Sequence, residues 1–418
     1  MYLEIFKISK TIQTIGIQSI GSIATIITVF EVTSRYGLEG QGYWATYRSV
    51  LELICALVIF GFPQIFTYTI NKNNTLLSDI LRFCLRYLTL VWPVISILLF
   101  FSLSTGVINA GGAVINDSIT LIFSGLLYVI YAFIRGISIA ITPILIYNLI
   151  TILPSIVQLL LIYLWPSESI INIPWIIMVS LLTSVFIGVK LTLKFSNLNE
   201  RSNNSKKLWQ PDLILYGFWW FLTGFLQMLI PFVFYQLIQC NENKLIEVGN
   251  LSIAFLVVGA MLLPINILGP LIFNDLTKIT KEHQRQILFT KIGRLLMAST
   301  FIATGLFNIY QKQISITLLH GRYVEAVSIA AVMVLSIPFA YYTRLVNSMA
   351  ASDGDSNRNA ILMGLRVACT IVPPFIFPIN LELVAWSYAF GEIMSAIFAV
   401  IYLKNIRNWS WRCIFMIY

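Results

Sequence analysis

The chain has 418 residues, with 58% hydrophobic and 11% charged side chains, a mean hydropathy of +0.83 and a net charge of +9. So apolar a composition excludes a water-soluble fold. The positive charge would suggest a nucleic-acid partner in a soluble protein, but its placement along the chain, given below, excludes that explanation and no such partner is expected.

Apolar stretches of membrane-spanning length follow one another along almost the whole chain. A helix needs about 20 apolar residues to cross the hydrocarbon, and there it satisfies its own backbone hydrogen bonds. We predict an all-α integral membrane protein with about twelve transmembrane helices and no signal peptide, because no cleavage site follows the long first span. The predicted spans are 12–33, 43–69, 84–104, 118–138, 143–165, 174–195, 212–238, 249–272, 287–310, 326–349, 360–379 and 382–403.

The most polar stretch, residues 196–211, follows the sixth predicted span. It predicts two six-helix lobes around a central cavity, residues 1–196 and 212–418, joined by a cytoplasmic linker at 197–211. Such internal repeats are common in transporters. Because six is an even number, the two lobes would share one orientation, with their repeat axis along the membrane normal.

Lysine and arginine are unevenly divided between the two sides of the predicted membrane. With both termini in the cytoplasm, 22 of the 27 basic residues lie at cytoplasmic ends of spans and 5 on the opposite side. Cytoplasmic loops of membrane proteins carry this excess. The sequence therefore predicts that both termini are cytoplasmic, and the same bias accounts for the basic net charge.

Polar side chains form stripes at helical spacing on several spans. Two interpretations are open: hydrogen bonding between helices or the wall of a hydrated cavity. On span 5, the stripe that includes Asn148 and Ser155 favours hydrogen bonding. On spans 1, 4, 7 and 10 the recurrence at equivalent positions favours a cavity, whose aromatic and amide groups suit a sugar. The glycan-binding candidates are Gln18, Tyr128, Tyr131, Trp220, Thr223, Gln227 and Tyr341.

Ionisable residues within spans are a sharper signal, because a charge at the bilayer centre costs at least about 2.5–3.5 kcal/mol. Arg48 and Glu52 are four residues apart and able to pair, whereas Glu392 must be hydrated, paired or protonated. Arginine suits a diphosphate, because its planar guanidinium binds phosphate oxygens in pairs. The diphosphate-binding candidates are Arg344, Arg366, Arg135 and Arg48.

No residue pattern predicts a metal, a cofactor or a catalytic centre. The five cysteines are isolated from one another, without the spacing of metal ligands or of a disulfide framework. His283 and His320 fall in predicted loops on opposite sides of the membrane. We therefore expect that the chain is not an enzyme.

Two segments carry a resemblance to a known family. In Tyr36–Lys72, Gly37, Gly42 and Gly61 fill the glycine positions typical of the turn into span 2 and of its end, and His320–Ile361 is similar to the tenth span. The family is the polysaccharide-transporter branch of the multidrug/oligosaccharidyl-lipid/polysaccharide exporter superfamily, and in particular the O-antigen flippases of the Wzx type. The layout of spans extends the similarity over nearly the whole chain.

This resemblance implies a flippase in the bacterial cytoplasmic (inner) membrane. Its substrate would be an undecaprenyl diphosphate carrying one oligosaccharide repeat unit, moved to the outer leaflet by alternating access for O-antigen and lipopolysaccharide biosynthesis. A polysaccharide polymerase and a chain-length regulator would be candidate protein partners. One departure is that the deep first-span arginines sought in related lipid flippases are absent, since the only arginine there, Arg35, lies at the outer end.

Other functions stay open at this point. A multidrug or metabolite antiporter of the same superfamily would use Glu52 or Glu392 as a proton carrier. A lipid flippase of the same fold is a further alternative. A membrane polymerase or acyltransferase is disfavoured, because the outer loops are short and no cluster of His, Asp or Glu meets in one layer.

Overall fold

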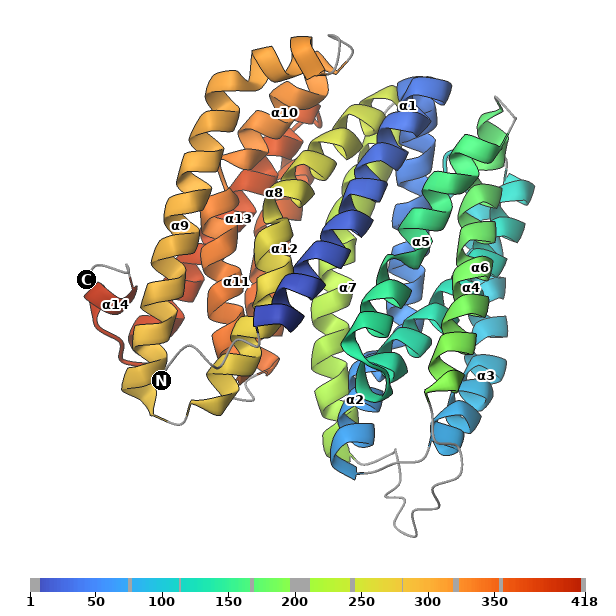
Figure 1. Ribbon diagram of the computed structural model, residues 1–418. Helices are drawn as coiled ribbons and strands as arrows, with labels where there is room; N and C mark the ends of the chain where they lie inside the picture. Colours follow the sequence, from blue (N-terminus) through green and yellow to red (C-terminus); the bar gives the residue numbers. More distant parts are fainter. Residues whose placement is uncertain are drawn as a thin grey trace. The chain divides into compact units, whose positions relative to one another are not determined.

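The computed structural model describes residues 8–73, 77–112, 114–165, 169–195, 211–240, 245–279, 281–318, 323–352 and 356–414. Helices make up nearly all of these residues, and no strand occurs among them (Figure 1). The chain divides into two compact units, here called the N-terminal unit, which runs from Lys7 to Gly249, and the C-terminal unit, which begins at Asn250. Each unit is considered by itself.

Helix α1 (Ile8–Ile59) contains two membrane spans. Its 52 residues would extend about 78 Å as a straight helix, more than twice the thickness of the hydrocarbon. Gly37 breaks it with φ 72° and ψ −175°, a backbone conformation that glycine adopts without steric strain. The two blue arms run in different directions from this corner (Figure 1), so they correspond to the first predicted span and most of the second.

The rest of the N-terminal unit consists of helices that pack against the two arms of α1 and against one another. The predicted span 43–69 is interrupted at Phe60 and Gly61, where φ is 45° and 69°. The helices that follow are α2 (Phe62–Asn73), α3 (Leu77–Ser104), α4 (Val114–Ile141), α5 (Ile144–Leu164), a 3₁₀ turn (Ile170–Asn172), α6 (Ile173–Lys194) and α7 (Pro211–Cys240).

The C-terminal unit contains the remaining helices, and its tenth predicted span is broken. Two helices bent by 51° replace the single span expected at 326–349. Pro338 explains the break, because proline lacks an amide hydrogen and disfavours a helical residue before it. The helices are α8 (Leu245–Lys278, which starts in the N-terminal unit), α9 (Glu282–Gln313), a π turn (Ile314–Leu318), α10 (Val324–Val334), α11 (Ile337–Ser352), α12 (Ser356–Ile376), α13 (Leu381–Asn405) and α14 (Trp411–Ile414).

The helices confirm the predicted fold class, a multi-pass all-α membrane protein. Within the described ranges, ten helices are long and apolar enough to cross a membrane, or up to eleven when α10 and α11 count as one bent span. Because α1 is counted once although it holds two predicted spans, this agrees with the prediction of about twelve.

The boundary between the two predicted lobes, at residues 197–211, differs from the boundary between the two compact units, which lies after Gly249. Helix α7 packs against α1 and α2 and belongs to the N-terminal unit, whereas the sequence assigned it to a lobe at 212–418. All of the predicted linker except Pro211 lies outside the described residues, as does His320. The six-plus-six division therefore stays a prediction.

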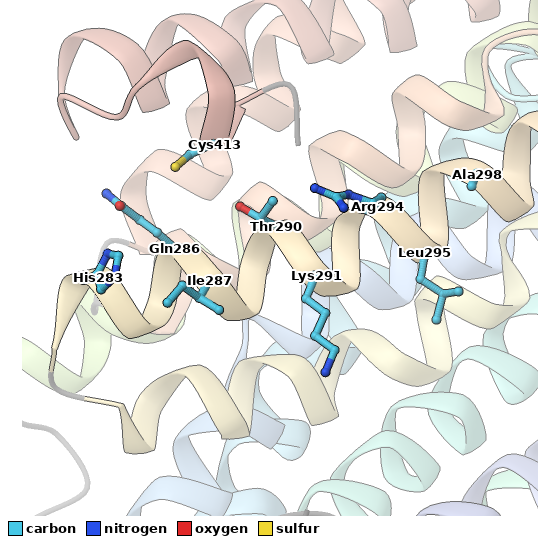
Figure 2. Close-up of a pocket in the computed structure, with 9 residues that line it drawn as sticks. All are labelled: His283, Gln286, Ile287, Thr290, Lys291, Arg294, Leu295, Ala298 and Cys413. Atoms are coloured by element: carbon cyan, nitrogen blue, oxygen red, sulfur yellow. The ribbon is translucent and has the colours of Figure 1, made fainter. Parts of the chain in front are cut away.

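The end of the chain returns to the start of α9. Trp409 is fully buried, its indole nitrogen donates to Glu282 at 2.9 Å, and its ring meets the edge of Phe289 at 5.1 Å between centroids. Figure 2 shows Cys413 of α14 on the side of α9 that carries Gln286 and Thr290. These contacts hold the short terminal helix beside the first turns of α9.

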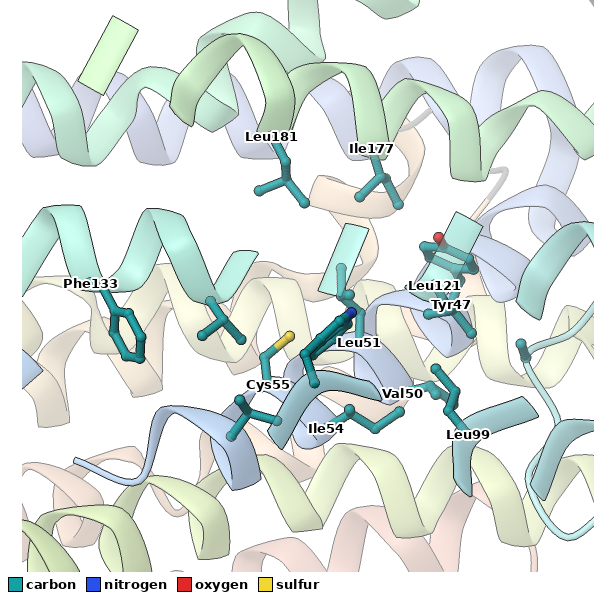
Figure 3. Packing of buried hydrophobic residues seen from close by; sticks show 14 of the residues in the cluster. Tyr47, Val50, Leu51, Ile54, Cys55, Leu99, Leu121, Phe133, Ile177 and Leu181 are labelled. Carbon is teal, nitrogen blue, oxygen red and sulfur yellow. The ribbon is translucent and has the colours of Figure 1, made fainter. Parts of the chain in front are cut away.

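The N-terminal unit has a core of interlocking apolar side chains (Figure 3). Val50, Leu51 and Ile54 of α1 belong to the same buried cluster as Leu121 of α4 and Leu181 of α6. Their spacing along α1 places them on one helical face. Because lipid is as apolar as these side chains, the contact is stabilised by close packing rather than by exclusion of water.

The second arm of α1 touches α8 backbone to backbone at Gly42. A Cβ atom on Gly42 would overlap the carbonyl oxygen of Leu245, and one on Gly249 would overlap that of Leu38. Small residues permit such close approach between membrane helices. The contact therefore depends on the absence of a side chain at both glycines.

Gly42→Ala should lower the stability of the purified protein by about 1–3 kcal/mol, because the added methyl group has no space. Thermal melting followed by size-exclusion chromatography in detergent measures the effect. Gly224→Ala is the matched control, since its methyl group meets no atom within 4 Å. Equal melting of the two variants would contradict the close contact.

Candidate functional site: arginine clusters within the spans

A buried ion pair joins α12 and α13 in the C-terminal unit. Arg366 Nη2 lies 2.6 Å from Glu392 Oε1, and the two side chains are only 8% and 2% exposed. Tyr388, one helical turn before Glu392, places its ring 5.6 Å from the guanidinium carbon of Arg366. Of the three states that the sequence left open for Glu392, the structure shows the paired one.

Arg344 of α11 is a second arginine near this pair. Its Nη1 donates to the side-chain oxygen of Asn266 in α8 at 2.7 Å, and the charges of Glu392 and Arg366 lie close enough to interact with it. Arg344 is half-buried and forms no ion pair with any residue that the structure describes. The cluster therefore contains two arginines and one glutamate, an excess of one positive charge.

The N-terminal unit holds a second ion pair, on the second arm of α1. Arg48 donates to Glu52 Oε1 from Nη2 at 2.9 Å and from Nε at 3.1 Å, which confirms the predicted pairing. The phenol groups of Tyr128 from α4 and Tyr235 from α7 lie near it. The side chains of Arg48 and Glu52 are 37% and 22% exposed, far more than their counterparts in the C-terminal unit.

Arg135 of α4 is the second diphosphate-binding candidate in the N-terminal unit. Its side chain is exposed, and Tyr128, Tyr131 and Tyr147 lie near it. It forms no ion pair with a residue in the described part of the chain. Like the C-terminal unit, the N-terminal unit thus has two arginines and one glutamate among the ionisable candidates of its spans.

The polar stripe of span 1 faces the stripe of span 5. Gln18 donates to Asn148 at 3.4 Å, Asn148 donates to Thr14 at 3.1 Å, and Thr25 donates to Ser155 at 3.0 Å. The expectation for span 5, hydrogen bonding between helices, is confirmed. The same contacts across α1 and α5 provide hydrogen-bond partners for the span 1 stripe, and a cavity role for Gln18 stays a prediction.

The other glycan candidates differ in how far they are exposed. Tyr131 and Tyr341 are buried, and their hydroxyl groups donate to the carbonyl oxygens of Ile150 and Met261 at 2.9 and 2.8 Å. Both therefore bind neighbouring helices through their polar atoms.

On α7, Trp220 is half-buried beside Tyr216, with 6.4 Å between ring centroids. Thr223 is half-buried and donates to Trp219 O at 2.9 Å. Gln227 is exposed. A glycan-binding role for any of these residues stays a prediction.

Sequence reasoning missed two members of the C-terminal cluster, Asn266 and Tyr388. Asn266 is the amide acceptor of Arg344, and Tyr388 stacks beside Arg366. A signal was present in each case: Asn266 interrupts a long apolar stretch, and Tyr388 lies one turn from the only carboxylate in the middle of its span. Among the described residues, no group of three or more His, Cys, Asp or Glu side chains is able to hold a metal ion.

Comparison with known proteins relates the chain to others by fold. No protein-family model and no curated protein matches it. Among solved structures it is similar to a MATE in complex with MaL6, at 11% identity and a TM-score of 0.68 over 96% of both chains. It is also similar to the MATE multidrug transporter DinF-BH, at 14% identity and a TM-score of 0.64 over 100% of this chain and 98% of that one.

A further similar structure is the inward-facing conformation of a multidrug resistance MATE family transporter of the MOP superfamily. The identity is 11% and the TM-score is 0.63, over 93% of this chain and 99% of the other. At such identities the comparison shows a shared fold. The chain therefore has the fold of the MATE transporters, and the proteins that it resembles are transporters rather than enzymes.

Proposed function

We propose that the chain is a membrane transporter that works by alternating access and carries an anionic substrate. The fold supports transport, since it is shared with MATE transporter structures in an inward-facing and in an outward-facing conformation. The arrangement of arginines and carboxylates supports a negatively charged substrate. Both carboxylates that the sequence offered for ion coupling are held by arginines, while Arg344 and Arg135 have no carboxylate partner among the described residues.

The single observation that carries the proposal is the position of Arg344. It is a half-buried cation within a membrane span, held by the amide oxygen of Asn266 rather than by a carboxylate. A cation within a membrane span is energetically costly unless it is hydrated or paired with a negative charge. A phosphate group would supply the missing negative charge and accept hydrogen bonds from the guanidinium group.

The substrate that we propose is a polyprenyl-diphosphate-linked oligosaccharide, in keeping with the resemblance to the Wzx-type flippases. Its diphosphate would meet arginine side chains, its sugars would meet aromatic and amide groups of the spans, and its hydrocarbon tail would stay in lipid. The phosphates and hydroxyl groups cannot cross hydrocarbon unaided. We place the protein in the bacterial cytoplasmic membrane, with both termini in the cytoplasm and with the polysaccharide polymerase and chain-length regulator as partners.

A second candidate is a cation-coupled multidrug or metabolite antiporter. The similarity to the MATE multidrug transporter DinF-BH supports this alternative. Glu52 would then be the more accessible coupling residue, because its ion pair is partly exposed. The excess of arginine over glutamate in both units favours the anionic substrate.

Deleting the gene should remove surface polysaccharide and leave lipid-linked repeat units on the cytoplasmic face of the membrane. The reason is that the diphosphate and sugars cannot cross the hydrocarbon unaided. Immunoblotting of surface polysaccharide, together with extraction of lipid-linked intermediates, measures both outcomes. Full-length surface polysaccharide in a deletion strain without a redundant flippase would refute the flippase, and a change in drug resistance alone would favour the antiporter.

A further inference from the structure

A groove of about 790 Å³ lies along one face of α9 in the C-terminal unit. Of the nine lining residues drawn in Figure 2, eight belong to α9, from His283 to Ala298, and the ninth is Cys413 of α14. They recur at intervals of three and four residues, which places them on one helical face. With about 1.5 Å of rise per residue, this face is about 22 Å long, so the groove has the elongated shape of a lipid chain.

The groove combines an apolar lining with basic groups. Leu295 and Ala298 line its far part, while Lys291 and Arg294 are exposed halfway along it. Figure 2 shows these two basic side chains extending to either side of the helix face. No Asp or Glu is among the lining residues that the structure describes. This pattern is complementary to a ligand with one anionic group and an apolar chain.

Thr290 is an independent sign of a missing hydrogen-bond acceptor. It lines the groove, is only 5% exposed, and its hydroxyl group has no hydrogen-bond partner within the described ranges. On the same helix the hydroxyl groups of Ser299 and Thr300 donate to backbone oxygens three residues earlier. A buried polar group without a partner is unfavourable, and a phosphate oxygen between Lys291 and Arg294 would supply one.

The predicted topology places the basic part of the groove near the cytoplasmic surface of the membrane. The start of α9 follows the basic segment that includes Lys278 and Lys281, which the positive-inside bias assigns to the cytoplasm. From there α9 enters the hydrocarbon, so Leu295 and Ala298 lie deeper than Lys291. A lipid of the cytoplasmic leaflet would enter the groove in the same sense, with its headgroup outward and its acyl chain inward.

We propose that the groove along α9 binds an anionic glycerophospholipid of the cytoplasmic leaflet. The lipid phosphate accepts hydrogen bonds from Thr290, Lys291 and Arg294, and one acyl chain lies along Leu295 and Ala298. None of these residues belongs to the cluster around Arg344. The site is therefore separate from the proposed transport site, and the proposal does not depend on which substrate is carried.

Native mass spectrometry of the full chain, with added dioleoyl phosphatidylglycerol or phosphatidylcholine, tests the proposal. We expect the wild-type protein to retain phosphatidylglycerol in preference to phosphatidylcholine. The variant K291A/R294A should bind phosphatidylglycerol about tenfold more weakly or worse, since it removes both basic groups that attract the anionic headgroup. Lys312→Ala, an exposed charge at the other end of α9, should bind as the wild type does.

Thr290→Val keeps the shape of the side chain and removes only its hydroxyl group, so it tests the site even if the double variant fails to fold. It should weaken phosphatidylglycerol binding, and Thr290→Ser should restore it. Equal retention of the two lipids by the wild type would overturn the proposal. Wild-type binding of phosphatidylglycerol by a folded K291A/R294A protein, or by Thr290→Val, would overturn it as well.

Discussion

Arg344→Ala should abolish transport, or reduce it about thirtyfold or more, while the protein still folds and inserts. Truncating one partner of a hydrogen-bonded charge pair in a desolvated site costs about 2–5 kcal/mol, and every 1.4 kcal/mol corresponds to a factor of ten. Arg344 is unpaired, so no buried carboxylate of the described residues loses its direct ionic partner when it is removed. Complementation of the deletion strain and flipping by reconstituted vesicles both measure the loss.

Arg344→Lys should rescue transport only in part, because lysine keeps the charge but not the planar guanidinium group that binds two phosphate oxygens. Arg201→Ala, in the polar stretch between the sixth and seventh predicted spans, is the control and should be harmless. A topology assay belongs with both, since arginines also contribute to orientation. Full transport by an Arg344→Ala protein that is inserted at wild-type levels would rule out the phosphate role.

Glu392→Gln should destabilise the protein by about 3–5 kcal/mol, because it leaves the buried charge of Arg366 without a partner. Thermal melting of the purified protein in detergent measures this loss. Glu52→Gln is the matched control: the same change removes one partner of a partly exposed pair, whose contribution is about 0.2–1 kcal/mol. The ratio of the two effects therefore reports on burial rather than on the chemistry of the substitution.

A double variant separates the ion pair from other roles of Glu392. R366M/E392M removes both charges together, so it should recover most of the stability that Glu392→Gln loses. If the Glu392→Gln and Glu52→Gln proteins melted at the same temperature, the buried ion pair of Arg366 and Glu392 would not be a stabilising contact. Transport by both glutamine variants that kept its normal dependence on a pH gradient would remove Glu52 and Glu392 from the proton-carrier role.

Features that depend only on neighbouring residues along one helix could be predicted from the sequence. About 20 apolar residues in a row determine a span, because backbone groups in hydrocarbon must be satisfied within the helix. The spacing of Arg48 and Glu52 determined that they were able to pair, since residues four apart lie on one helical face. Neither inference needs knowledge of how the helices pack against one another.

Features that depend on two helices meeting were decided by the tertiary structure alone. The sequence placed Arg366 and Glu392 in different spans and made Arg366 a candidate for binding a diphosphate. It did not show that the packing of α12 on α13 would pair the two side chains. In the same way, the sequence did not show that α5 would bring Asn148 against the polar stripe with Gln18. A stripe of polar groups shows that a helix face needs hydrogen-bond partners. Whether those partners are water, substrate or another helix depends on which faces the folded chain brings into contact.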